Sequence, residues 1–343
     1  MISGKRVIAA MLTALMAVTF TANTAVSVYA TGVTATENAQ TIDAQSTDAQ
    51  ALTPEEQKAQ ELQQVYDMPV ESNGYKDWPQ GPGTYGEAGI VMEVGTGAIL
   101  YAKNIDAHEY PASITKVLTA LVALENGQLT DNVTFSHDSV AFLQRGDSSV
   151  GLKEGNVITL DQAMHAMLLA SANDAAIALA EACAGDVDSF AEMMNEKAEE
   201  LGAENTHFAN PNGLPDETHM TTVADMALFA REAMKNETFR KIVSTYEYTI
   251  PATELQPEAR LIHNSNRLLY DEVHKAVIGD ETRPYKYDGI LGIKTGYTDA
   301  ARSCLVAAAE RDGMTLIGVV YRSEPETLYP DMIQLLDFGF DNF

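Results

Sequence analysis

Residues 110–124 read Tyr110-Pro-Ala-Ser-Ile-Thr-Lys-Val-Leu-Thr-Ala-Leu-Val-Ala-Leu124 and hold the only Ser-x-x-Lys of the chain. After Pro111 the apolar side chains recur with a period near 3.6 residues, which predicts that a helix opens here. Ser113 and Lys116 are one helical turn apart, so their side chains are expected on the same face. The pair predicts a serine nucleophile with an amine base beside it.

The lysine is the informative member of this pair, because ordinary helix capping does not explain it. A serine at a helix start usually has Glu or Gln three residues later as its partner. A cation in the first turn meets the positive end of the helix dipole, which costs about 0.3–1 kcal/mol. Lys116 is therefore expected to serve catalysis, and a plain helix cap at Ser113 is the alternative.

Two further short motifs accompany the Ser-x-x-Lys. Ser171-Ala-Asn173 lies where one apolar helix is expected to end and another to begin, and Lys294-Thr-Gly296 follows the apolar run Gly289–Ile293. Each is the only match of its kind in the chain, and each alone could be a helix cap or a strand end. Three such motifs in this order are typical of enzymes that form an acyl ester on serine.

With these motifs, the chain resembles the serine penicillin-binding proteins. Within that class it is most similar to the low-molecular-weight D-alanyl-D-alanine carboxypeptidases of peptidase family S11. The resemblance runs from about Gly86 to Phe343. Besides the three motifs, it is carried by the segments Gly146-Asp-Ser-Ser-Val-Gly-Leu152, Asn210-Pro-Asn-Gly-Leu214, Asn264-Ser-Asn-Arg-Leu-Leu269 and Gly292-Ile-Lys-Thr-Gly-Tyr-Thr-Asp299.

The resemblance implies acyl transfer through a covalent ester on Ser113. Lys116 is expected to act as a free amine that takes the serine proton, with a pKa lowered by burial and by nearby cations. By resemblance, Ser171 passes a proton towards the leaving amine and Asn173 hydrogen-bonds the substrate amide. His219 matches a family histidine near the site entrance, and a structural or surface role is an equal alternative.

The resemblance also implies the substrate-binding residues. Lys294 and Thr295 are expected to bind the substrate carboxylate, and Gly296 to leave room for the substrate backbone along a strand. The oxyanion is expected between the backbone N–H groups of Ser113 and Tyr297. The expected substrates are peptidoglycan stem peptides that end in D-Ala-D-Ala, with β-lactams as covalent inhibitors.

The chain departs from the family pattern at two positions. Arg302 stands where the family usually has glycine, and Leu328 stands where it often has an arginine that holds the substrate's terminal carboxylate. We hypothesise that Arg302 replaces that contact. The alternative is a solvent-facing arginine on a strand.

Composition supports an exported globular protein. The chain has 343 residues and a net charge of −27, which argues against nucleic acid or an anionic bilayer as a partner. Lys5 and Arg6 precede the apolar stretch Val7–Phe20, and Val28-Tyr-Ala30 fits a cleavage site, so residues 1–30 are predicted to be a signal peptide. An uncleaved anchor is the alternative. The mature protein is expected in the extracellular space or associated with the cell wall.

The rest of the chain is divided into a tether and a catalytic domain. Residues 31–80 are rich in Thr, Ala, Gln and acids, which predicts a solvated tether with one helix, Pro54–Tyr66. Residues 81–343 are predicted to form the catalytic domain.

No metal site or cofactor is expected, because the histidines lack metal-ligand spacing. Cys183 and Cys304 are expected as free thiols, and no C-terminal membrane anchor is expected.

Strands are predicted at both ends of the catalytic domain and helices between them. This order indicates an α+β fold in which an antiparallel sheet flanked by helices carries an inserted all-helical subdomain, as in β-lactamases and transpeptidases. The expected helices are Leu160–Leu169, Asp174–Ala184, Val187–Leu201, Thr222–Lys235 and Asp331–Phe338. The expected strands are Ala88–Val94, Ala98–Lys103, Tyr246–Ile250, Ile290–Thr295, Ser303–Glu310 and Met314–Tyr321.

Three other functions stay open at this point. A class A-like β-lactamase shares two of the motifs, but it usually needs a deacylating glutamate in Glu-x-x-Leu-Asn, and no such motif follows Asn173. A non-catalytic module that binds peptidoglycan or β-lactams is the second. Endopeptidase activity on cross-linked stems is the third, because the same residues would support it. The preferred stem peptide and the oligomeric state do not follow from these residues.

Overall fold

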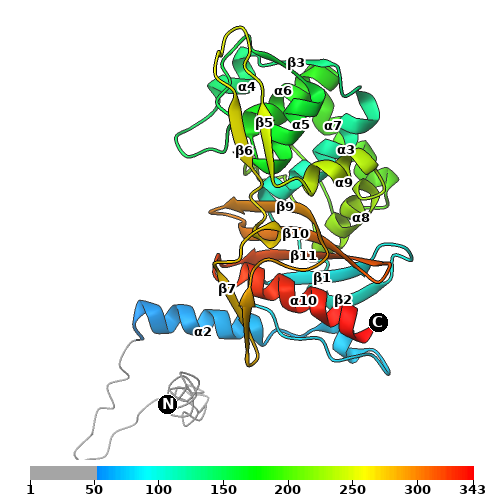
Figure 1. The fold of residues 1–343 in the computed structure, drawn as a ribbon. Helices are drawn as coiled ribbons and strands as arrows, with labels where there is room; N and C mark the ends of the chain where they lie inside the picture. The colour runs from blue at the N-terminus through cyan, green and yellow to red at the C-terminus, as the bar shows by residue number, and fades with distance from the viewer. Residues whose placement is uncertain (1–51) are drawn as a thin grey trace, which may run out of the picture. The chain divides into compact units, whose positions relative to one another are not determined.

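Five antiparallel strands form the central sheet, in the order β2-β1-β11-β10-β9 (Figure 1). The computed structural model describes residues 52–343. The predicted signal peptide and the predicted tether before residue 52 lie outside the described residues. The sheet strands are β1 (Ala88–Glu93), β2 (Ile99–Lys103), β9 (Ile290–Thr298), β10 (Arg302–Arg311) and β11 (Met314–Ser323).

The sheet joins the two ends of the domain, as the order of predicted elements indicated. β1 pairs with β2 on one side and with β11 on the other, so the first hairpin and the last one share one sheet. β10 and β11 are joined through Asp312 and Gly313, whose φ angles are +50° and +83°. Two residues with positive φ make the tight turn that matches the twist of a hairpin. The predicted α+β fold is confirmed.

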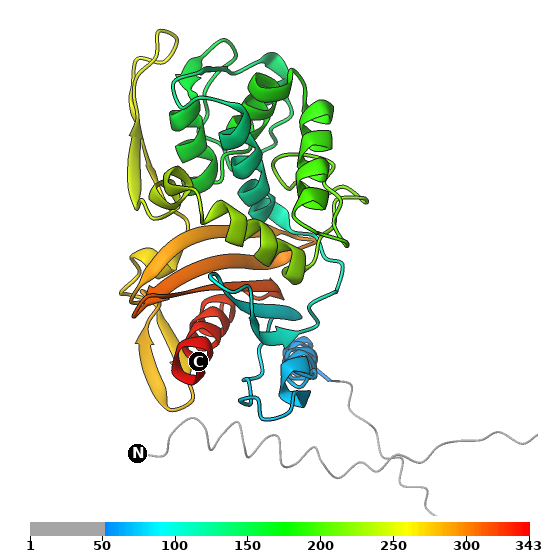
Figure 2. The same ribbon diagram turned by 90° about the vertical axis from the view of Figure 1, so that its right-hand side faces the viewer.

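A helical half is inserted between β2 and β9 and lies above one face of the sheet in Figures 1 and 2. Four of its helices match their predicted ranges within two residues at each end. Thr159 and Gln162 form a capping box at the start of α5. The helices are α3 (Lys116–Asn126), α4 (His137–Ala141), α5 (Leu160–Leu169), α6 (Asn173–Ala184), α7 (Val187–Glu200), α8 (Val223–Ala233) and α9 (Glu237–Val243).

Side chains along the strands point alternately to the two faces of the sheet, and a hydrophobic core lies on each face. Val306 and Ile317 belong to the core shared with the helical half, whereas Leu305 and Leu316 belong to the core beneath α10 (Leu328–Asn342). Successive strand residues point to opposite faces, so a strand buried on both faces is apolar almost throughout. Both layers appear in Figure 2, with α10 below the sheet.

The described part of the predicted tether contacts the catalytic domain. Helix α2 has the predicted bounds, Pro54–Tyr66. The ammonium of Lys103 is fully buried and donates to the carbonyl of Val65 at 2.8 Å. The indole Nε1 of Trp78 donates to the carbonyl of Leu100 at 2.8 Å. Residues 52–80 thus contact the domain at these points, although α2 itself has no buried residue.

Neither a disulfide nor a membrane-spanning helix is present in residues 52–343, and short elements complete this part of the chain. Cys183 and Cys304 are free thiols, as predicted. None of the helices in residues 52–343 has the length and apolar character that a membrane crossing requires. The remaining elements are η1 (Glu71–Gly74), η2 (Ala112–Thr115), β3 (Asn132–Thr134), β4 (Val157–Thr159), β5 (Glu247–Ile250), β6 (Arg260–His263), η3 (Arg267–Leu269), β7 (Lys275–Ile278) and β8 (Glu281–Pro284).

Candidate active site

Ser113 lies in the short 3₁₀ turn η2, and Lys116 is the first residue of α3. Neither η2 nor α3 has a side-chain capping bond at its start, so Ser113 does not act as a helix cap. The hydroxyl of Ser113 is half-buried, whereas Lys116 is fully buried. The predicted helix opening is therefore a 3₁₀ turn that runs into an α-helix and places the lysine beneath the serine.

The Lys116 amine contacts three oxygen atoms. Its Nζ lies 2.8 Å from the Ser113 Oγ, 2.8 Å from the Asn173 Oδ1 and 2.5 Å from the backbone carbonyl oxygen of Asn212. The two carbonyl-type oxygens only accept hydrogen bonds, so a neutral amine gives them its two protons. The nitrogen lone pair is then directed at Ser113, whose hydroxyl is the one neighbour that can donate.

The electrostatic setting favours this neutral amine. Burial lowers the pKa of Lys116 well below its ordinary value, and the positive charge of Lys294 lowers it further, against a smaller opposing effect of Asp174. Burial also lowers the pKa of Lys294, to about 7. Desolvation penalises the charged form of a lysine, and a neighbouring cation adds to that penalty.

The Ser-x-Asn motif occupies the connection between α5 and α6. Ser171 is half-buried and has a φ of +60°, a left-handed conformation that is uncommon outside glycine. Asn173 is the first residue of α6 and is buried, and its backbone N–H donates to the Ser148 carbonyl at 2.8 Å. Asp174 is fully buried and accepts a hydrogen bond from the Ser149 hydroxyl at 2.8 Å. These bonds fix the loop before α5 against the motif.

Strand β9 brings the Lys-Thr-Gly motif to Ser113. Lys294 pairs with Val306, whose side chain belongs to the core beneath the helical half, so Lys294 shares that face. Gly296 lies against η2: a Cβ there would be 3.1 Å from the backbone nitrogen of Ser113 and 3.1 Å from the Pro111 carbonyl oxygen. β9 is an outer strand of the sheet, so one of its edges has no strand partner among residues 52–343.

Ser265 also belongs to the site, although the sequence reasoning did not select it. Its Oγ lies 2.7 Å from the Oγ1 of Thr295, and its backbone N–H donates to the carbonyl of Leu169 at 3.1 Å. It therefore links β9 to the end of α5, close to Ser171. The only signal in the sequence was its position inside Asn264-Ser-Asn-Arg-Leu-Leu269, one of the segments that carry the family resemblance.

His219 lies next to η2, the nucleophile turn, which carries Ser113. It is buried, and its Nδ1 accepts from the backbone N–H of Ala209 at 3.1 Å, so Nε2 carries the ring proton. Nε2 then donates to the Oγ1 of Thr115 at 2.8 Å. Burial lowers the pKa of His219 to about 4, which keeps the ring neutral at pH 7. The structure places this residue in the interior, against Thr115, rather than at the surface.

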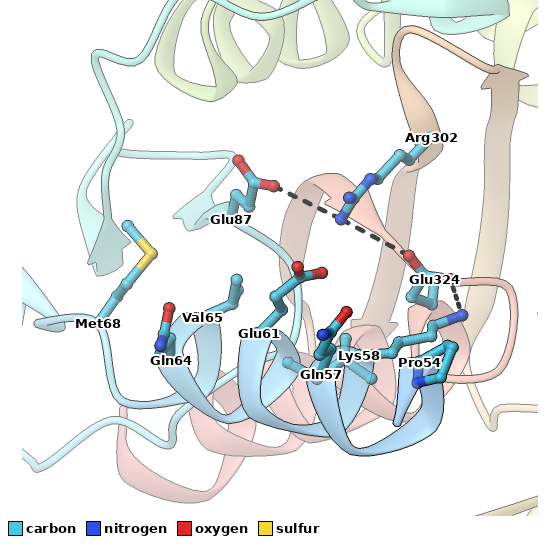
Figure 3. A pocket seen from close by; sticks show the side chains of 11 residues that line it. Pro54, Gln57, Lys58, Glu61, Gln64, Val65, Met68, Glu87, Arg302 and Glu324 are labelled. Carbon is cyan, nitrogen blue, oxygen red and sulfur yellow. Dashed lines mark hydrogen bonds and ion pairs between the residues drawn. The ribbon is translucent and has the colours of Figure 1, made fainter. Parts of the chain in front are cut away.

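Tyr297 and Arg302 lie farther along the β9–β10 hairpin. The Tyr297 side chain is 61% exposed, and its hydroxyl donates to Asp299 at 3.1 Å. The Arg302 guanidinium points into a groove beside α2, 3.7 Å from a carboxylate oxygen of Glu87 and 3.6 Å from one of Glu324 (Figure 3). A contact between Arg302 and the substrate stays a prediction. In residues 52–343, no group of three or more His, Cys, Asp or Glu side chains could hold a metal ion.

A buried amine beside a serine hydroxyl, next to an outer strand of an antiparallel sheet, is the arrangement expected of a serine hydrolase that uses lysine as its base. The family model for D-alanyl-D-alanine carboxypeptidases, peptidase S11, matches residues 79–324. The chain belongs to this family.

Several relatives are about one-third identical to this chain. The carboxypeptidase DacF of Bacillus subtilis is 34% identical over 263 residues, which cover 75% of this chain and 62% of DacF. DacB2 of Mycobacterium tuberculosis is 34% identical over 281 residues, which cover 80% of this chain and 88% of DacB2. The chain thus spans less than two thirds of the length of DacF.

Solved structures show the same fold. The crystal structure of the Streptomyces K15 DD-transpeptidase has a TM-score of 0.68 and 32% identity, and the match covers 77% of this chain and all of that one (100%). The D-alanyl-D-alanine carboxypeptidase of Mycobacterium tuberculosis H37Rv has a TM-score of 0.67 and 32% identity, over 78% of this chain and 94% of that one.

Proposed function

We propose that this protein is a serine D-Ala-D-Ala carboxypeptidase that removes the terminal D-alanine from peptidoglycan stem peptides. The observation that carries the proposal is the Lys116 amine, which is buried, held by the oxygens of Asn173 and Asn212, and aimed at the Ser113 hydroxyl 2.8 Å away. A base held within hydrogen-bond distance of a serine is the requirement for nucleophilic catalysis.

In the first step, the Ser113 Oγ attacks the carbonyl carbon between the two D-alanines while its proton passes to the Lys116 Nζ. The carbonyl oxygen becomes an oxyanion, which the backbone N–H groups of Ser113 and Tyr297 stabilise. The carbon–nitrogen bond then breaks, and a proton delivered through Ser171 lets D-alanine leave as an amine. The product is an ester between the shortened stem peptide and Ser113.

In the second step, water attacks the ester and gives a proton back through Lys116. The shortened stem peptide leaves with a new carboxylate, and the Ser113 hydroxyl is restored. The Asn173 side chain holds the substrate amide through both steps.

The substrate lies along the open edge of β9. Its terminal carboxylate binds the ammonium of Lys294 and the hydroxyl of Thr295, a charge-assisted arrangement. The scissile carbonyl then lies beside Gly296, where the absent side chain leaves space next to Ser113. Upstream residues of the stem extend towards Tyr297 and beyond, as an added strand would.

We also propose that the protein acts outside the cytoplasmic membrane. The support is the sequence: a basic start at Lys5 and Arg6, the apolar stretch Val7–Phe20, and small residues at the cleavage site that ends in Ala30. This location would bring the site to the cell wall. N-terminal sequencing of the secreted protein tests it, and a mature chain that starts at residue 31 is expected.

Intact-mass spectrometry after incubation with benzylpenicillin, followed by peptide mapping, tests the chemistry. A stable adduct on Ser113 that is absent in Ser113→Ala, together with D-alanine release from a D-Ala-D-Ala peptide, is the expected result. Rapid loss of the adduct with hydrolysed drug would indicate a β-lactamase instead. A protein that forms no adduct and releases no D-alanine would be a non-catalytic module.

A further inference from the structure

Arg322 lies at an irregularity in the central sheet. Between the pairs Ser303–Ser323 and Leu305–Val320, β11 has one more residue than β10, which is a β-bulge. Arg322 is in this bulge with a φ of +52°. A left-handed conformation costs a non-glycine residue about 1–2 kcal/mol, and it persists where the surroundings determine it. The bulge therefore turns the Arg322 side chain in a direction that a regular strand would not allow.

The Arg322 guanidinium bridges three separate segments. Its Nε donates to a Glu87 carboxylate oxygen at 2.9 Å and lies 3.4 Å from a carboxylate oxygen of Glu109. Its NH1 group donates to the backbone carbonyl of Ala300 at 2.8 Å. A planar guanidinium with several donors suits such a bridge, whereas a lysine ammonium offers a single point charge.

Two of these partners lie within four residues of Ser113 or Gly296 in the chain. Glu109 lies four residues before Ser113, and its backbone N–H and carbonyl both pair with Thr221, at 2.9 and 3.0 Å. Ala300 lies in the turn between β9 and β10, four residues after Gly296. Arg322 thus joins the segment that leads into the nucleophile to the turn that follows the Lys-Thr-Gly motif.

The spacing between these two segments leaves little freedom. A Cβ at position 296 would already lie 3.1 Å from the Ser113 nitrogen, so β9 passes close to the nucleophile turn. Catalytic rates respond steeply to small displacements: a shift of about 1 Å can lower the rate about 100-fold. A brace across the two segments would therefore act on the chemistry without touching the substrate.

We propose that Arg322 is a positioning residue that holds the Ser113 segment and β9 in register for acylation. The proposal rests on the proposed function. Arg322 is expected to affect the rate of the chemical step rather than substrate binding. Its partners do not include Lys294 and Thr295, the residues expected to bind the substrate carboxylate. Loss of the brace is expected to lower kcat far more than it raises KM.

Arg322→Gly is the first variant to test. Glycine adopts a φ of +52° without strain, so the bulge is kept while the guanidinium is removed. We expect kcat for a D-Ala-D-Ala peptide and the second-order rate of Ser113 acylation by benzylpenicillin to fall about 30- to 100-fold, with KM changed less than about threefold. Arg322→Lys keeps a positive charge but lacks the several planar N–H donors of the guanidinium, and is expected to recover only part of the rate.

Arg231 supplies a matched control, because it also braces a hairpin turn. Its Nε donates to the Val94 carbonyl at 2.6 Å and its NH2 group to the Gly95 carbonyl at 3.2 Å, which ties the β1–β2 turn to α8. Arg231→Ala removes this brace at a turn that carries none of the predicted site residues, and its acylation rate is expected to stay within about twofold of the wild type. Thermal unfolding of both variants separates loss of fold from loss of rate.

A double-variant cycle with Glu109→Gln tests the bridge itself. If Arg322 acts through Glu109, the two substitutions together cost no more than the larger of them alone. Additive effects on the acylation rate, or an Arg322→Gly variant that acylates as fast as wild type, would overturn the positioning role. Wild-type protein that forms no Ser113 adduct would instead overturn the proposed function, so the two failures are distinguishable.

Discussion

The positive charge of Lys294 lowers the pKa of the Lys116 amine, and both lysines are fully or almost fully buried. One cation thus serves two expected purposes, since Lys294 is also the proposed partner of the substrate carboxylate. The proposed mechanism needs Lys116 neutral and Lys294 charged. The two pKa values therefore set the pH range in which the free enzyme is competent.

Substitution of Lys294 is expected to move the acid limb of the pH profile. Without the neighbouring cation the pKa of Lys116 rises. When pH is lowered, Lys116 of Lys294→Gln should therefore become protonated, and its acylation rate should fall, at a higher pH than in the wild type. The measurement is the second-order rate of benzylpenicillin acylation between about pH 5 and 9.

Lys294→Arg is the matched control, because it keeps the charge. Its acid limb is expected to coincide with that of the wild type. On the alkaline side the wild type should lose rate as pH rises through about 7, the pKa of Lys294, whereas an arginine stays charged. An unchanged acid limb in Lys294→Gln would show that the two lysines are not coupled.

Gly296→Ala is expected to slow acylation at least tenfold with a small change in stability. The new Cβ would lie 3.1 Å from the Pro111 carbonyl oxygen and 3.2 Å from the Ala112 Cβ, so β9 and the nucleophile turn must move apart. Gly74→Ala is the control, because nothing lies within 4 Å of a Cβ at that position. Equal acylation rates for the two variants would contradict the close approach of β9.

The sheet and the long helices could be predicted because their signals are local. Asp312 and Gly313 lie between two apolar runs, the pattern of a hairpin turn, and Thr159 with Gln162 forms a local capping box at the start of α5. Strands β6, β7 and β8 were missed because each has only four residues, too few to establish a periodic pattern of apolar side chains. Such strands depend on tertiary contacts rather than on their own sequence.

The three motifs could be recognised in the sequence from their residue types and spacing. How their side chains are arranged in space could be seen only in the folded structure. The sequence could not show that the Asn212 carbonyl accepts from Lys116, because this contact joins residues 96 positions apart. It also could not show that Ser265 meets Thr295. Backbone carbonyls carry no side-chain signal, and a lone serine is common on protein surfaces.

His219 is expected to make the fold less stable at acidic pH. Its pKa is about 4 in the folded protein, below the ordinary value of 6.5, because burial disfavours the charged ring. As pH falls below 6.5 the unfolded chain gains a proton that the folded one does not, so the free energy of unfolding decreases.

Urea denaturation of the wild type and His219→Gln between about pH 7 and 4 measures this effect. Relative to the variant, the wild type should lose up to about 3 kcal/mol over this range, at about 1.4 kcal/mol per pH unit. Parallel curves for the two proteins would mean that His219 titrates normally in the folded state.

Arg302→Gly decides whether Arg302 contacts the substrate. Two carboxylates, from Glu87 and Glu324, already lie near its guanidinium. If Arg302 holds the substrate carboxylate as hypothesised, kcat/KM for a D-Ala-D-Ala peptide falls tenfold or more in this variant, with KM rising and kcat unchanged. A change of less than about threefold would show that Arg302 only pairs with these two carboxylates.

The open edge of β9 has a consequence beyond substrate binding. A strand edge that can accept a stem peptide can also accept a strand of another protein molecule, and unpaired edges promote aggregation. Here η2 packs against Gly296 and the Ser265 hydroxyl lies 2.7 Å from that of Thr295, so neighbouring segments cover part of β9. We expect this cover to limit edge-to-edge association of protein molecules while it leaves room for one extended peptide.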